Sequence, residues 1–203
     1  MKYKLTIIIM ALAAIGIAFA TQAKATTITY NFQENGLGNL GPTSTFTESG
    51  FSLTASGFLT AGGATNLFAK SSGPGETGLG TNSDGDHEVN TSNFVQLTLP
   101  TTPPANFQLV LLASVQSGEE ADIYFSNTSG VLGTKIGTLT SDGSFAIPSG
   151  DQTGFIGITA GSGNVLLAGA QINTTVPDGG SAVALLGIAL AAIEGLRRAL
   201  RTK

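Results

Sequence analysis

The chain has 203 residues, no cysteine and no tryptophan, and a formal net charge of −4 at pH 7. The absence of cysteine excludes a disulfide framework and thiolate chemistry. Between residues 26 and 175 only Lys70 and Lys135 oppose eleven carboxylates, so this segment has a net charge of −9. Because phosphate binding needs clustered Lys and Arg, this charge pattern excludes nucleic acid as a partner.

The first 25 residues have the pattern of a signal peptide. Two lysines open the segment, residues 5–20 are mostly apolar, and Ala23 and Ala25 flank Lys24 in the small-x-small arrangement of a cleavage site. We therefore expect a signal helix that is cleaved after Ala25, leaving Thr26 as the first residue of the exported protein. An uncleaved transmembrane helix is the alternative, but an apolar run that ends in a cleavage site suits a signal peptide better.

Residues 26–175 have the pattern of one all-β domain. Short stretches of apolar and β-branched residues alternate with clusters of Gly, Asn, Ser and Pro, and no stretch shows a sustained helical period. We predict strands at 27–33, 45–47, 50–55, 58–60, 66–70, 94–99, 107–115, 121–126, 135–140, 144–147, 154–159 and 164–173. Short strands at this spacing predict an antiparallel β-sandwich of jelly-roll type.

The longest segment predicted to be irregular is 71–93, and its second half is rich in oxygen donors. Asn82, Asp84, Asp86 and Glu88 alternate with other residues along it. Ca²⁺ takes six to eight oxygen ligands, and carboxylates two residues apart on a glycine-bent loop can converge on one ion. The pattern predicts a calcium site here. The alternative interpretation is a solvated acidic turn whose side chains cap their own backbone.

The same segment and its surroundings offer little for catalysis. His87 is the only histidine, and the chain has no Gly-x-Ser-x-Gly elbow that would supply it with a nucleophile. Glu119, Glu120 and Asp122 form a second acidic cluster, but their spacing does not place two carboxylates at the separation that glycoside hydrolysis needs. We therefore expect that the protein is not an enzyme.

Residues 176–203 form a tail of three parts. The first part is a hinge, because proline fixes φ and the glycines keep the backbone mobile; it consists of Val176, Pro177, Asp178, Gly179 and Gly180. An apolar run over 182–193 follows. The last part holds cations that resist crossing a bilayer, namely Arg197, Arg198, Arg201 and Lys203. This order predicts a membrane helix with a cytoplasmic C-terminus and with residues 26–175 on the far side.

Glu194 is an unusual residue for such a helix. It shortens the apolar run to about 12–15 residues, below the ~20 that span a bilayer comfortably, unless its carboxylate snorkels toward the cytoplasmic arginines. A buried helix of a soluble domain is the alternative interpretation. It is disfavoured because a buried helix would show polar residues on one side, and none precedes Glu194 in the apolar run.

The tail resembles the C-terminal sorting domain of the PEP-CTERM class of bacterial exported proteins, most closely its VPDSG-CTERM variant. Val176, Pro177 and Asp178 stand at the signature positions, and Gly179 takes the place of the more usual serine. The resemblance implies that an exosortase, a membrane protease or transpeptidase, recognises and processes the tail. It implies nothing about what residues 26–175 bind.

Taken together, these patterns predict an exported surface or extracellular-matrix protein of structural or interaction type. Two alternatives stay open. The first is a calcium-dependent module that binds extracellular polysaccharide, which an exposed Phe or Tyr beside the 82–88 loop would favour. The second is a carbohydrate-active enzyme, which would need two carboxylates converging in one cleft.

Overall fold

The computed structural model describes residues 24–34, 37–71, 73, 76–83, 85–102, 104–176 and 179–201. The chain divides into two compact units, and residues Thr27–Thr174, called the body below, form the larger one. Helix α2 (Gly179–Arg201) belongs to the other unit.

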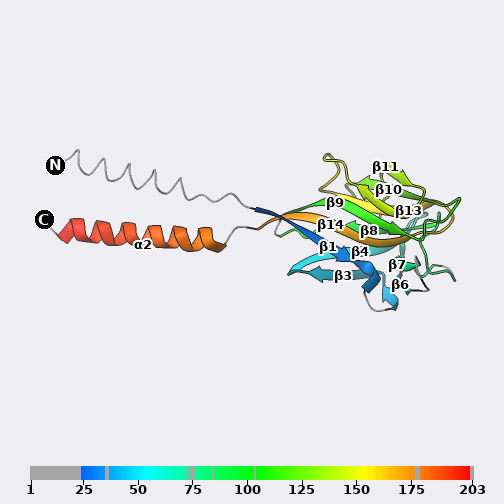
Figure 1. Cartoon of the computed structure of the whole chain (residues 1–203), viewed down its shortest axis with the longest axis horizontal. Helices are drawn as coiled ribbons and strands as arrows, with labels where there is room; N and C mark the ends of the chain where they lie inside the picture. The colour runs from blue at the N-terminus through cyan, green and yellow to red at the C-terminus, as the bar shows by residue number, and fades with distance from the viewer. Residues whose placement is uncertain are drawn as a thin grey trace. The chain divides into compact units, whose positions relative to one another are not determined.

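The strands of the body form two antiparallel sheets of seven strands each (Figure 1). The first sheet has the order β12-β9-β14-β7-β6-β2, and β1 also pairs with β14. Its strands are β1 (Lys24–Asn31), β2 (Gly38–Gly41), β6 (Leu67–Ser71), β7 (Thr77–Thr81), β9 (Ala105–Ala113), β12 (Gly143–Ala146) and β14 (Leu166–Val176). A single turn of 3₁₀ helix, η1 (Phe32–Glu34), follows β1.

The second sheet has the order β11-β10-β13-β8-β4-β3, and the short β5 pairs with β4. Its strands are β3 (Thr43–Glu48), β4 (Phe51–Leu59), β5 (Ala64–Thr65), β8 (Asn93–Thr98), β10 (Glu120–Ser126), β11 (Thr134–Leu139) and β13 (Phe155–Ser162). The predicted strands 50–55 and 58–60 are thus one continuous strand, β4.

The order of the last eight strands is that of a jelly roll. They pair as β7-β14-β9-β12 in one sheet and as β8-β13-β10-β11 in the other, so the chain crosses repeatedly between the two layers. Strands β6 and β2 widen the first sheet, and β4 and β3 widen the second. The predicted antiparallel sandwich is therefore confirmed.

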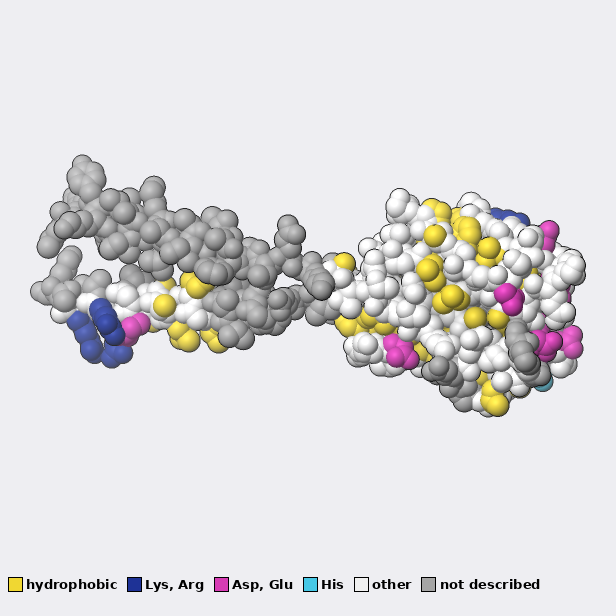
Figure 2. Space-filling view, viewed as in Figure 1, with side chains coloured by type: hydrophobic (Ala, Val, Ile, Leu, Met, Phe, Trp, Pro, Cys, Tyr) yellow, Lys and Arg dark blue, Asp and Glu magenta, His cyan; other side chains and the backbone are white. Residues whose placement is uncertain are grey.

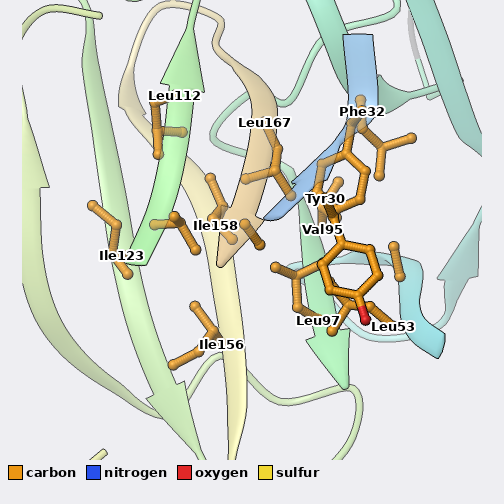
Figure 3. Close-up of a cluster of buried hydrophobic side chains, with 14 of the residues drawn as sticks. Tyr30, Phe32, Leu53, Val95, Leu97, Leu112, Ile123, Ile156, Ile158 and Leu167 are labelled. Carbon is orange, nitrogen blue, oxygen red and sulfur yellow. The ribbon is translucent and has the colours of Figure 1, made fainter. Parts of the chain in front are cut away.

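One hydrophobic core joins the facing sides of the two sheets (Figure 3). Leu97 and Ile158 of the second sheet and Leu167 of the first are fully buried within it. Strand β1 and η1 contribute a period-two series, in which Ile28, Tyr30 and Phe32 are 4%, 1% and 1% exposed. Burying each large apolar side chain stabilises the fold by about 1.5–3 kcal/mol. The prediction that these three residues share one face of the first strand is confirmed.

Strand β7 corrects the prediction that 71–93 is irregular throughout. Its residues Gly78 and Gly80 are the kind that ends a predicted strand, yet both are buried in the sheet. A Cβ on Gly78 would lie 2.8 Å from the carbonyl oxygen of Leu167 in β14, and one on Gly80 would collide with the carbonyl oxygen of His87. Glycine is therefore required here because other backbone segments pack directly against the strand.

Helix α2 has 23 residues and follows the body with only residues 177 and 178 between its start and the end of β14. Three of its apolar side chains, Leu186, Leu190 and Ile193, are 61%, 58% and 62% exposed, and Ile188 is half-buried. Among the residues that the structure describes, no helix reaches the length and apolar character of a membrane span.

Candidate functional site

A hollow of about 520 Å³ opens on the body beside the acidic segment. Strands β2 and β6 and residues 85–87 supply its walls. The lining residues are Leu37, Gly38, Phe68, Ala69, Lys70, Ser71, Gly85, Asp86 and His87. Apolar, basic and acidic groups thus meet in one open depression.

The aromatic part of the hollow is a stack of Phe68 and His87. Their ring centroids are 3.8 Å apart and the rings are tilted by only 9°. His87 has a φ of 61°, a left-handed conformation that few residues other than glycine adopt, although histidine is among the more tolerant. Because Gly80 has no side chain, the backbone of His87 can pass close to β7 at this point.

The basic part of the hollow is Lys70, whose ammonium group is held by two carboxylates. Its Nζ lies 2.6 Å from Oε1 of Glu88 and 3.6 Å from Oε2 of Glu76. Ser114 Oγ donates a second hydrogen bond of 3.2 Å to the same oxygen of Glu88, which is only 5% exposed. This network ties β6 to the segments that follow β7 and β9.

The network also sets the protonation of Lys70. Burial works to lower the pKa of the Lys70 ammonium, but the hydrogen bond and negative charge of Glu88, with those of Glu76, outweigh it and raise that pKa above its ordinary value. Lys70 is therefore a cation at neutral pH, and Oε1 of Glu88 is its nearest carboxylate oxygen.

The residues of the predicted calcium site have different roles in the structure. Glu88 points to Lys70 and Ser114, whereas Oδ2 of the exposed Asp86 accepts a hydrogen bond of 3.3 Å from Asn164 Nδ2. Asn82 is exposed, and Asp84 lies outside the described residues. Within the described part of the chain, no three His, Asp or Glu side chains come together to hold an ion. The calcium site stays a prediction, and its proposed ligand Glu88 already binds Lys70 and Ser114.

The second acidic cluster is also divided among structural contacts. Asp122 Oδ1 accepts a hydrogen bond of 2.7 Å from Thr138 Oγ1 and lies 2.6 Å from Nζ of Lys135. This hydrogen bond to Asp122, together with the negative charge of Asp122, raises the pKa of the Lys135 ammonium and outweighs the opposing effect of burial. Glu119 instead accepts hydrogen bonds from the backbone N–H groups of Gln116 and Asn164, at 2.8 and 3.2 Å. These carboxylates hold loops and strands in place.

The sequence analysis did not predict that Phe68 and Lys70 line the hollow, or that Lys70 forms an ion pair with Glu88. Lys70 is one of only two lysines between residues 26 and 175, and that scarcity was the available signal. Phe68 lies on a predicted strand, and nothing in the local pattern indicates which of its neighbours approaches from the loop.

The tail has its own charge arrangement near the end of α2. Glu194 Oε1 accepts a hydrogen bond of 2.9 Å from Nε of Arg198, and its Oε2 lies 3.7 Å from Nη1 of Arg197. Figure 2 shows acidic and basic side chains together in the tail, with apolar side chains next to them. The carboxylate that interrupts the apolar run therefore has its countercharges on the same helix.

Several predicted processing residues lie outside the described residues: Ala23, Pro177, Asp178 and Lys203. Of the other residues of the hinge motif, Val176 ends β14 and Gly179 and Gly180 begin α2. Ala25 lies within β1, so cleavage after it would remove two residues from that strand and none from the core. Signal cleavage and the stop function of the tail cations stay predictions.

Fold and tail together define a β-sandwich body that is followed, after residues 177 and 178, by a C-terminal helix of 23 residues with a basic end. A family model, described as the VPDSG-CTERM motif, matches residues 175–200. The predicted resemblance of the tail is thereby confirmed, and the match supports an exported protein with an exosortase-type enzyme as the partner of its C-terminal signal. A search of curated proteins finds no match to the chain.

Proposed function

We propose that this is an exported surface or extracellular-matrix protein of structural or interaction type, anchored in the membrane through α2 until an exosortase-type enzyme processes the tail. The observation that carries the proposal is the match of the sorting motif to residues 175–200. The position of that motif supports it as well, because residues 176–180 connect the last strand of the body to the helix.

The charges of α2 favour membrane insertion. An isolated carboxylate is costly in hydrocarbon, by about 2.5–3.5 kcal/mol for a charged residue at a helix centre on insertion scales. Glu194 lies near the basic end of the helix and is paired with Arg197 and Arg198. The pairs can sit together at the cytoplasmic interface, which leaves the apolar run before them to enter the bilayer.

The use of charged groups in the body favours a structural or interaction role over catalysis. Glu88 and Asp122 are buried and bind lysines, and Glu119 holds two backbone N–H groups. Carboxylates that are held in such ion pairs and hydrogen bonds stabilise the scaffold and are not available as general acids or bases.

The test of the sorting role is to express the full chain in a host that has the sorting enzyme and to follow its location and mass. Pro177→Ala with Asp178→Ala should leave the protein membrane-bound and unprocessed, because the recognition motif is lost while the helix remains. Pro148→Ala with Asp151→Ala changes the same residue types in a turn of the body, where Asp151 N–H donates to Pro148 O, and should leave processing unchanged.

Two further variants test the anchor. Replacing Arg197, Arg198, Arg201 and Lys203 by Gln should let folded protein leak into the medium, since four cations no longer resist crossing. A chain that ends at Val176 should be exported but not retained. Retention of that truncated chain at the wild-type location would end the sorting proposal.

A second candidate function is polysaccharide binding at the hollow. It is favoured by the aromatic residue Phe68 beside the acidic loop, together with the polar groups of Asp86 and Lys70 in the same depression. Because the body has a net charge of −9, a neutral glycan is the better ligand than an acidic one. Phe68→Ala should abolish retardation of the protein in gels that contain neutral polysaccharide. Phe58→Ala, at the stacked Phe58–Phe94 pair of the other sheet, is the matched control and should have no effect.

A further inference from the structure

The two ends of the body are joined in one ladder, formed by β1 and β14. Thr27 Oγ1 donates a hydrogen bond of 2.7 Å to Asn173 Oδ1, and Gln171 Nε2 donates one of 3.0 Å to Thr29 Oγ1. The residue numbers rise along β1 as they fall along β14, so the two strands are antiparallel. The first strand of the body is thus fastened to the last one.

The opposite edge of β14 is occupied as well. Its residues Ile172, Asn173 and Thr174 pair in register with Phe107, Asn106 and Ala105 of β9. Ile172 and Thr174 are 0% and 1% exposed, and Thr174 Oγ1 donates a hydrogen bond of 3.2 Å to Pro104 O. The end of β14 therefore has a neighbouring strand on both sides and a buried inner face.

The paired part of this strand extends to Thr174, two residues before Val176, which is the first residue of the sorting motif. Strand β14 ends at Val176, immediately before Pro177, and β1 begins at Lys24. An enzyme that binds a peptide in extended form does so through main-chain N–H and C=O groups and through pockets for alternate side chains. In the closed sandwich, the residues of β14 that precede the motif already use their main-chain groups to pair with β1 and β9.

We infer that the processing enzyme acts on chains in which the β1–β14 ladder is open, and that closure of this ladder shields residues 171–174, which lie just before the motif. The inference rests on the proposed sorting function and adds the conformational state of the substrate to it. The ladder joins residues 146 positions apart in the sequence. Non-local pairing of this kind is slow to form, which leaves a period after synthesis in which the tail is accessible.

The experiment uses an introduced disulfide, which is unambiguous because the chain has no cysteine of its own. Full-length Thr27→Cys with Asn173→Cys locks the ladder. Full-length Thr47→Cys with Ser52→Cys is the matched control, because these two residues also pair across strands, with their hydroxyl oxygens 3.0 Å apart, in the β3–β4 hairpin far from the motif in sequence. Each protein is accumulated in membranes without the sorting enzyme and is then oxidised. These membranes are solubilised in detergent together with membranes that contain the enzyme, so that enzyme and substrate can meet.

The measured quantity is the rate at which the mass of the processed body appears. The oxidised ladder variant should be processed at least tenfold more slowly than wild type, and reduction should restore the rate. The oxidised hairpin control should match wild type. Processing of the oxidised ladder variant at the wild-type rate would overturn the inference.

An insertion separates this inference from the proposed function on which it rests. Eight Gly and Ser residues placed between Thr175 and Val176 move the motif away from the ladder, so processing should be faster than in wild type and insensitive to the Thr27–Asn173 lock. An insertion variant that the lock still slows would contradict shielding. If neither the reduced proteins nor the insertion variant is processed at all, the sorting function itself fails and the inference fails with it.

Discussion

The body and the tail satisfy their charges in different ways. In the body, Lys70 binds Glu88, which is 18 residues away, and Lys135 binds Asp122 on the neighbouring strand. In the tail, Glu194 binds Arg197 and Arg198 within one turn of the same helix. The ion pairs of the body exist only in the folded sandwich, whereas those of the tail need only the helix.

Their apolar residues differ in the same way. The large apolar side chains of the body are buried between two sheets, and Leu53, Leu97 and Ile158 are 0% exposed. In α2, Leu190 and Ile193 are 58% and 62% exposed. The comparison shows that the body supplies its own apolar surroundings, whereas these two side chains of the helix are open, which is compatible with the bilayer of the proposed function.

Truncating one leucine in each region should give the largest contrast. Leu97→Ala leaves a cavity in the core and should lower the free energy of unfolding by about 2–5 kcal/mol. Leu190→Ala should change the unfolding of the body by less than about 0.5 kcal/mol, as is usual for exposed positions. Thermal and urea unfolding followed by circular dichroism measures both. An equal loss in the two variants would mean that α2 is part of the folding unit of the body.

Removing one carboxylate from each region should give the next contrast. Loss of the partner of a buried charge costs about 3–5 kcal/mol. Glu88→Gln should lower the free energy of unfolding by about 3 kcal/mol, the lower end of this range. The loss is limited because Glu76 remains 3.6 Å from Lys70. Glu194→Gln should cause no measurable change in the free energy of unfolding of the body. Within the body, Glu76→Gln is the matched control and should cost less than about 1 kcal/mol, since that carboxylate is partly exposed.

Alkaline pH should destabilise the body. Burial, with a smaller effect of Glu48, raises the pKa of the Tyr30 hydroxyl from 10.0 to about 12. A group whose pKa is higher in the folded state stabilises it fully below the unfolded pKa, and this contribution is lost as pH rises toward the folded pKa. Stability should therefore fall between pH 10 and 12 by about 2–3 kcal/mol from Tyr30, at about 1.4 kcal/mol per unit of pKa.

Tyr30→Phe tests this assignment. The variant loses the hydrogen bond of 3.1 Å to Phe51 O but should show a shallower decline over the same pH range. Part of the decline should persist, because the raised pKa values of Lys70 and Lys135 act in the same direction above about pH 10.5. An identical slope in wild type and variant would contradict the assignment. Helix α2 contains neither Tyr nor Lys, so the pH response should belong to the body.

Glu194→Leu should have the smallest effect. It removes a carboxylate that its arginine partners already neutralise, so the gain in membrane affinity of the unprocessed chain should be less than about 1 kcal/mol. Extraction of membranes at high pH measures the retained fraction, which should rise slightly while the unfolding curve of the body stays unchanged. A fall in retention would show that the ion pairs, and not the apolar length, hold the tail.

Much of the fold could be predicted because alternation of side chains is a local property. The predicted strand 121–126 corresponds to β10, and the face shared by Ile28, Tyr30 and Phe32 follows from period two alone. Strand β7 could not be predicted in this way. Its glycines resemble a loop unless one knows that the backbones of Leu167 and His87 press against them.

The candidate site was predictable only in part. The acidic segment was evident as a pattern, and the hollow lies beside it. The pairing of Glu88 with Lys70 and Ser114, and the stack of His87 on Phe68, join segments from different strands. Which segments become neighbours depends on the order of strands in the sheet, and no local pattern contains that information.

The sequence by itself determined the tail, because a hinge, an apolar run and terminal cations are consecutive along the chain and the sorting motif is defined by such a local order. It also determined that the body is a sandwich of short strands. Only the tertiary structure decided that Glu88 pairs with Lys70 and that β14 is held between β1 and β9 as far as Thr174. The physical reason is that these contacts join residues 18 to 146 positions apart, and their formation depends on how the whole sheet is assembled.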